Sequence, residues 1–78
     1  RQAAAWLNRG VARHLLDEHE KALQDMNQAI QLDYFNVQAW AKRGIIQYEL
    51  DSLDQAIADF NHAISLDNEN PLDNFQRG

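Results

Sequence analysis

Three histidines are the residues of this chain best suited to catalysis or metal binding, because imidazole serves as a general base and as a metal ligand near neutral pH. They are His14, His19 and His62. None has a second His or a carboxylate at the helical spacing of an assembled metal site. His14 and His19 are five residues apart and are expected on different faces. We therefore expect surface or groove-lining histidines, and we predict no catalytic residue, no metal site and no cofactor.

Asp17, Glu18 and Glu20 form an acidic cluster, and carboxylates are ligands that Ca²⁺ prefers. The segment lacks the alternating oxygen ligands and the internal Gly of a calcium-binding loop. Carboxylates are also common on protein surfaces. We interpret the cluster as a solvated turn.

The aromatic faces of Trp6 and Trp40 are of the kind on which a base or a sugar stacks. These two residues recur 34 positions apart, however. Recurrence at a fixed period favours a place in a repeated core.

Arg9 and Arg43 each precede a Gly, and either guanidinium could bind an acidic ligand. Asp25 and Asp59 recur with the same period of 34 residues. An Arg and a carboxylate facing each other across two helices form two parallel hydrogen bonds. We therefore predict that Arg9 pairs with Asp25 and Arg43 with Asp59, each inside its own repeat.

The composition argues against several classes of function. The 78-residue chain has a formal net charge of -5 and a pI near 4.9, the wrong sign for binding a phosphate backbone. It has no Cys and no run of about 18 apolar residues. We expect no nucleic-acid partner and no membrane, and we favour a soluble, cytoplasmic setting. The chain begins at Arg1 and not at a Met, so we expect it to be part of a longer protein.

The sequence repeats with a period of 34 residues. A shift of 34 superposes Gly10 on Gly44 and Gly44 on Gly78, each preceded by Arg, and Trp6 on Trp40. Further identical pairs are Leu16 and Leu50, Asp17 and Asp51, Ala22 and Ala56, Ala29 and Ala63, and Ile30 and Ile64. A period of this length is typical of stacked structural repeats.

Within each unit the apolar residues recur at three and four positions, which indicates helices. We predict helices over residues 3–16, 19–32, 37–50 and 53–66, with a fifth beginning near Pro71. The expected N-cap residues are Asn36 and Asn70, and Ser52 with Gln55 fits a capping box. The short connections make neighbouring helices antiparallel, and no alternating β-branched run predicts a strand.

These positions resemble the tetratricopeptide repeat (TPR), a 34-residue unit with Trp, Gly, Ala, Phe and Pro at fixed offsets. The chain shows the pattern at Trp6, Gly10, Ala22, Met26 and Ala29, and again at Trp40, Gly44, Ala56, Phe60 and Ala63. The resemblance implies an all-α fold, a right-handed α-solenoid of stacked antiparallel helix hairpins. It divides the chain into repeat 1 (residues 3–36), repeat 2 (residues 37–70) and, over residues 71–78, a truncated first helix of a third repeat or a capping helix.

Small residues mark the places where two helices approach closely. We expect Gly10 to face Ala22 and Gly44 to face Ala56 within the two hairpins. The residues predicted to be largely buried are Trp6, Gly10, Ala22, Met26, Trp40, Gly44, Ala56, Phe60 and Ala63.

In the TPR family the first helix of each repeat lines a concave groove in which partner peptides lie. Carried onto this chain, the groove positions are Leu7, Val11, His14, Gln38, Ala41, Lys42, Ile45, Tyr48 and Glu49, with Phe75 extending them. Four of them are expected to form one apolar surface: Leu7, Val11, Ile45 and Tyr48. Lys42 is its only fixed cation.

One TPR subclass grips the acidic C-terminal tails of heat-shock chaperones with Lys, Asn and Arg at fixed groove positions. Here those positions hold Leu7, Val11, Lys42, Leu72 and Gln76. The resemblance therefore does not extend to the binding of chaperone tails.

Three functions remain open. The leading hypothesis is a non-catalytic scaffold that binds a peptide or helix of a partner protein in the groove. The second is a self-association or assembly module, with a possible homo-oligomer of the chain alone. The third is an accessory domain of an enzyme whose catalytic part lies elsewhere. The apolar stripe of the groove could also be covered by another part of a longer chain or by a second copy.

Overall fold

The computed structural model describes residues 2–68, which form four helices joined by short turns. In chain order these are α1 (Gln2–Leu15), α2 (His19–Leu32), α3 (Val37–Glu49) and α4 (Leu53–Asn68). This range contains no strand, so the predicted all-α fold is confirmed. None of its helices has the length and the apolar run needed to cross a bilayer. The predicted fifth helix, with Asn70 and Pro71, lies outside the described residues.

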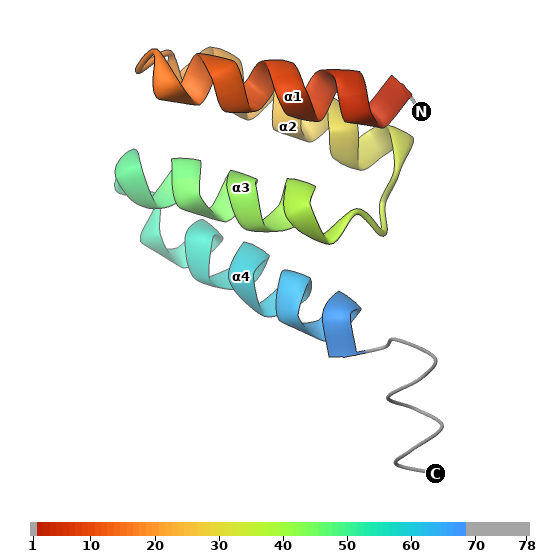
Figure 1. The fold of residues 1–78 in the computed structure, drawn as a ribbon. Coiled ribbons are helices and arrows are strands. Elements are labelled where there is room, and N and C mark those ends of the chain that lie inside the picture. The colour runs from red at the N-terminus through yellow and green to blue at the C-terminus, as the bar shows by residue number, and fades with distance from the viewer. Residues whose placement is uncertain (1, 69–78) are drawn as a thin grey trace, which may run out of the picture.

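The four helices make two hairpins that stack on each other (Figure 1). Within the hairpins α1 packs on α2 and α3 packs on α4, while α2 packs on α3 between the hairpins. Contact between α1 and α3 is slight. The stacked helical repeat agrees with the predicted solenoid, and its right-handed sense stays a prediction.

The turn inside each hairpin depends on an Asp in the left-handed region of backbone conformation. Asp17 has φ 64°, and Asp51, its counterpart in the second repeat, has the same value. In the first turn the N–H of Glu18 donates to the carbonyl of Arg13 at 2.8 Å, and the N–H of Asp17 donates to the carbonyl of His14 at 3.0 Å. The same two bonds recur around Asp51. This is the Schellman arrangement, which satisfies the last carbonyls of a helix and reverses the chain.

The two predicted N-caps differ in outcome. Asn36 caps α3 as expected, because its side-chain oxygen accepts from the N–H of Ala39 at 3.3 Å. The capping box at Ser52 and Gln55 is wrong, because the N–H of Ser52 donates to the carbonyl of Gln47 in the Schellman turn. That N–H is therefore already used when α4 begins.

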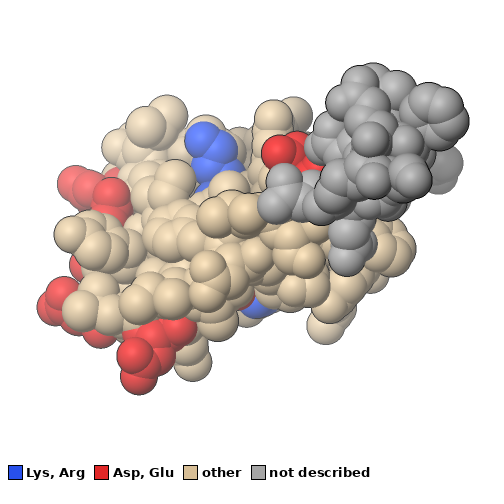
Figure 2. Space-filling model, turned by 90° about the horizontal axis from the view of Figure 1, so that it is seen from below, with Lys and Arg blue, Asp and Glu red and all other residues tan. Residues whose placement is uncertain are grey.

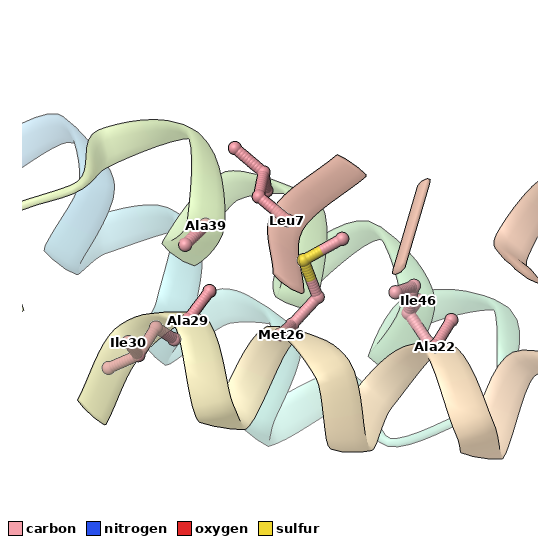
Figure 3. Packing of buried hydrophobic residues seen from close by; sticks show 7 residues of the cluster. All are labelled: Leu7, Ala22, Met26, Ala29, Ile30, Ala39 and Ile46. Carbon is pink, nitrogen blue, oxygen red and sulfur yellow. The ribbon is translucent and has the colours of Figure 1, made fainter. Parts of the chain in front are cut away.

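The core lies where α2 meets α1 and α3. Its fully or nearly fully buried apolar members are shown in Figure 3: Leu7, Ala22, Met26, Ala29, Ile30, Ala39 and Ile46. Trp6, Val11, Leu23 and Trp40 pack against this cluster and are partly buried. Packing of one hairpin on the next supplies a core that a single hairpin cannot enclose.

Most of the predicted burial is confirmed, but the three large aromatic residues are only half-buried. Trp6, Trp40 and Phe60 lie at the rim of the helix pairs, whereas the predicted Gly, Ala and Met residues are buried. The outer face of each Trp ring is covered by an arginine, with the Cζ atoms of Arg9 and Arg43 each 4.7 Å from the ring centroid. A cation packed on an indole face partly shields it without a second helix.

The two glycines face different side chains. A Cβ on Gly10 would lie 2.8 Å from the Met26 methyl carbon, 3.1 Å from the Asp25 Cβ and 3.4 Å from the Ala22 carbonyl oxygen. A Cβ on Gly44 would lie 2.8 Å and 2.9 Å from ring atoms of Phe60. The Phe60 ring is therefore the nearest neighbour of Gly44, and the expected facing of Gly44 and Ala56 stays a prediction.

Both predicted ion pairs are confirmed. Nε and Nη2 of Arg43 lie 2.7 Å and 2.9 Å from the carboxylate oxygens of Asp59, which is 5% exposed. The Arg9 guanidinium binds Asp25 in the same two-pronged way. Each pair joins the two helices of its own hairpin, so these arginines are occupied within the fold.

Candidate functional site

The first helices of the two hairpins, α1 and α3, carry the predicted groove positions and lie next to each other in Figure 1. The second helices hold this arrangement, since α2 packs on both α1 and α3. The inner sides of α1 and α3 contribute Leu7, Ala39 and Ile46 to the core, and α3 also packs on α4, so only the sides of α1 and α3 that pack on no neighbouring helix offer free surface.

The predicted groove residues differ in how much surface they offer. Gln38, Tyr48 and Glu49 are exposed. The half-buried positions are Val11, His14, Ala41, Lys42 and Ile45. Phe75 lies outside the described residues.

The expectation that Leu7 forms part of the apolar groove surface is wrong. Leu7 is 8% exposed and belongs to the core cluster, because the face of α1 that carries it packs toward α2. Of the other three residues predicted for this surface, Val11 and Ile45 are half-buried, and Tyr48 has an exposed fraction of 62%.

On the first helix, sequence reasoning missed the exposed apolar residue Leu15, at the end of α1. Its counterpart one period later is Glu49, which was among the predicted groove positions. The 34-residue shift could therefore have identified Leu15 from the sequence.

The structure brings His14, His19 and Glu49 together, although two of them were expected on different faces. His14 lies in the last turn of α1, His19 begins α2 and Glu49 ends α3. Nε2 of His14 lies 2.8 Å from Oε1 of Glu49, and Nε2 of His19 lies 2.7 Å from the same oxygen. The two imidazole rings meet edge to face, with centroids 5.4 Å apart. The error has a simple cause, since the left-handed turn at Asp17 reverses the chain between the two histidines.

Charges and hydrogen bonds within this trio shift two pKa values. The pKa of His19 is raised, first by a hydrogen bond to the backbone of Asp17 and then by the Glu49 carboxylate. The pKa of Glu49 is lowered, first by its hydrogen bond to His14 and then by the bond to His19. Both shifts favour the charged forms of His19 and Glu49.

The third histidine is neither a surface residue nor part of the groove. His62, in α4, is half-buried, with its ring centroid 4.0 Å from that of Trp40 and 5.2 Å from that of Tyr34. Its Nε2 is buried and has no hydrogen-bond partner in the part of the chain that the structure describes. His62 therefore serves as a packing residue between α4 and the start of α3.

The sequence profile of the tetratricopeptide repeat matches residues 3–36 and again residues 37–70. The chain belongs to the tetratricopeptide repeat family. TPR units generally mediate protein–protein interactions, and they are typically non-catalytic scaffolds. No curated protein matches the chain.

The exposed sides of α1 and α3 carry several of the residues that were predicted to line the groove. Function in repeat folds depends on the side chains displayed on the scaffold. Here those sides display the half-buried aliphatic residues Val11 and Ile45, the exposed Tyr48 ring and the polar groups of Gln38 and Lys42. This chemistry suits the binding of another chain, because it combines apolar contact with hydrogen bonding at its edges.

Proposed function

We propose that this TPR chain is a scaffold module that binds a peptide or helix of a partner protein on the exposed sides of α1 and α3. The observation that supports the proposal is the exposure of Tyr48, three residues after the half-buried Ile45 on α3, a spacing that places the two side chains on one face of the helix. Tyr is enriched among the residues that dominate binding energy at protein interfaces. We assign no catalytic residue and no cofactor to this surface.

The proposed ligand is an amphipathic segment with apolar residues spaced by three and four positions. Such a segment buries its apolar face on the stripe, which contributes about 25 cal/mol per Å² before the costs of association are subtracted. A segment ending in acidic residues is a poor ligand. The TPR positions that would hold a terminal carboxylate are occupied here by the core residue Leu7 and the half-buried Val11, so its charges would lose water without gaining donors.

Two substitutions of matched chemistry test the surface. An amphipathic peptide selected against the 78-residue chain is titrated by calorimetry into the wild type, Tyr48→Asp and Ile57→Asp. Tyr48 and Ile57 are both well exposed, on α3 and α4 respectively, so neither substitution opens the core. We expect Tyr48→Asp to weaken binding at least about tenfold, as for a central interface aromatic, and Ile57→Asp to leave binding unchanged.

The reverse pattern would place the binding surface on α4 and overturn the proposal. An acidic-tail peptide that binds more tightly than the amphipathic one, with affinity falling steeply as salt rises, would overturn the ligand chemistry.

Self-association is a second candidate, and the outer face of α4 favours it. Ile30 of α2 is 7% exposed because the second hairpin packs on α2, whereas its counterpart Ile64 of α4 is 58% exposed. Leu53 and Ile57 are exposed on the same helix. Figure 2 views the molecule from the side on which α4 lies, and most of the visible surface carries neither acidic nor basic side chains.

A mass measurement over a range of concentrations separates this candidate from simple peptide binding. If two copies of the chain associate through α4, the measured mass rises with concentration. The double variant Ile57→Lys with Ile64→Lys should then stay monomeric. A constant monomer mass at all concentrations would remove self-association from consideration.

A further inference from the structure

We propose that His14, His19 and Glu49 form a binding site for a divalent transition-metal ion, with Zn²⁺ as the fitting ion. One ligand atom from each residue lies within 4.8 Å of the others. The three side chains come from the ends of three different helices, so the site exists only when both repeats are folded and stacked.

The donor set fits zinc. Two imidazole nitrogens and one carboxylate oxygen are a ligand combination that Zn²⁺ uses with a fourth position left for water or another ligand. In a tetrahedral site with metal–nitrogen distances of about 2.0–2.1 Å, two ligand atoms lie roughly 3.3 Å apart. The two nitrogens lie 2.8 Å and 2.7 Å from Oε1 of Glu49, so a small outward movement of the exposed Glu49 side chain admits an ion.

The two histidines are already turned toward a common point. Both Nε2 atoms lie within hydrogen-bond distance of the same carboxylate oxygen, and neither ring is fully exposed. Binding would displace the proton from each Nε2, which passes to solvent from a charged imidazole and to Nδ1 of the same ring in a neutral one.

The trio does not follow the 34-residue repeat. The position equivalent to His14 in the second repeat is Tyr48, the one equivalent to His19 is Leu53, and Glu49 corresponds to Leu15. The repeated core therefore does not require these three polar residues. They are particular to the junction at which the end of the second repeat's first helix meets the turn of the first hairpin.

The surroundings favour a cation. An open hollow of about 590 Å³ adjoins the trio, and it is lined by Asp17, Glu18, Glu20 and Lys21 together with His19, Glu49 and Leu50. Three of these neighbours are carboxylates and one is an ammonium, so the hollow adds net negative charge beside the ligands. Water is available for the fourth position.

Calorimetric titration of the chelator-treated 78-residue chain with ZnCl₂ tests the site. We expect one Zn²⁺ per chain and a rise in Tm that grows with free zinc, because the ligands are assembled only in the folded state. Two variants remove ligands: Glu49→Gln, and His14→Tyr, which introduces the residue of the second repeat. Each should weaken binding at least about tenfold, since even partners outside the ligand set typically change metal affinity by that factor.

Two variants serve as matched controls. Glu20→Gln removes a carboxylate from the same hollow but not from the trio, and His62→Gln removes a histidine elsewhere. Both should keep the affinity of the wild type, and circular dichroism of the metal-free variants verifies that each one folds.

Three results would overturn the inference. The first is no zinc binding by the folded wild type. The second is an equal loss of affinity in Glu20→Gln and Glu49→Gln, which would indicate general attraction by acidic groups. The third is one zinc per two chains with a doubled mass, which would place the site between copies. None of these results concerns peptide binding at Tyr48. The proposed zinc site can therefore be wrong while the proposed peptide-binding function is right, and the reverse.

Discussion

The guanidinium of Arg9 holds the carboxylate of Asp25 with two hydrogen bonds, from Nε and Nη2, each 3.0 Å long. Asp25 is 1% exposed and lies in α2, so its negative charge is compensated by the neighbouring helix of the same hairpin. The second hairpin repeats this arrangement with Arg43 and Asp59. The pairs differ in their third partner. In the first repeat a second guanidinium group, that of Arg13, also contacts the carboxylate, with its Nη1 3.4 Å from Oδ2 of Asp25. The position equivalent to Arg13 in the second repeat holds Gln47.

Loss of the arginine should therefore be more damaging in the second repeat than in the first. Arg43→Met leaves the buried Asp59 with only the neutral amide of Gln47, which donates to it at 2.8 Å when oriented to suit both of its neighbours. An unsatisfied buried charge costs about 1–3 kcal/mol or more. Arg9→Met leaves Asp25 beside Arg13, so we expect a smaller loss in urea unfolding. The double variant Arg43→Met with Asp59→Leu should recover stability, because no buried charge then remains. A larger loss for Arg9→Met would contradict this account.

Gly44→Ala should destabilise the chain although Ala is the better helix former. The new methyl would meet the Phe60 ring at 2.8 Å, and overpacking of this kind costs about 1–3 kcal/mol. The gain in helix propensity is about 1 kcal/mol, so we expect a net loss of about 1 kcal/mol in thermal or urea unfolding. Phe60→Met, which introduces the first-repeat residue, should restore stability in the Gly44→Ala background. A Gly44→Ala chain more stable than the wild type would show that the ring moves aside without cost.

Asp51→Gly should stabilise the chain, because Asp51 has φ 64° and only Gly adopts this region without a steric penalty. The expected gain in the free energy of unfolding is about 0.5–1 kcal/mol. It is the steric penalty of the left-handed conformation, which Gly removes, minus the cost of the greater backbone entropy of Gly in the unfolded chain. Asp51→Ala is the control, since Ala keeps the penalty. Equal midpoints for the Gly and Ala variants in urea unfolding would exclude backbone strain as the cause.

The contribution of the His–Glu trio to stability should be greatest between about pH 4.5 and 6.5 in the presence of a chelator. The pKa of Glu49 lies below its ordinary value of 4.5, so its contribution is present above that pH and is lost as pH falls through the lowered pKa. The pKa of His19 lies above its ordinary value of 6.5, so its contribution is complete below 6.5 and is lost as pH rises through the raised pKa. The Tm difference between wild type and Glu49→Gln, measured across pH, should peak in this window. A difference that is constant from pH 4 to 9 would show that the charges do not contribute.

The sequence by itself determined the repeat unit, the four helices and the two ion pairs. Helix ends depend on local signals such as the Asn36 cap. Arg9 with Asp25, and Arg43 with Asp59, could be paired because a 34-residue period puts both members of each pair into a regular hairpin. Each of these features depends on spacing along one helix or on recurrence, which the sequence displays directly.

Only the tertiary structure decided which side chains are buried and which meet. Leu7 shares the first helix with Val11, and the angle at which α1 packs on α2 buries Leu7 and leaves Val11 half-exposed. His14, His19 and Glu49 meet because a left-handed turn and the stacking of two hairpins bring three helix ends to one place. No spacing along the sequence encodes that meeting, because it is set by the relative placement of helices, which depends on the packing of the whole core.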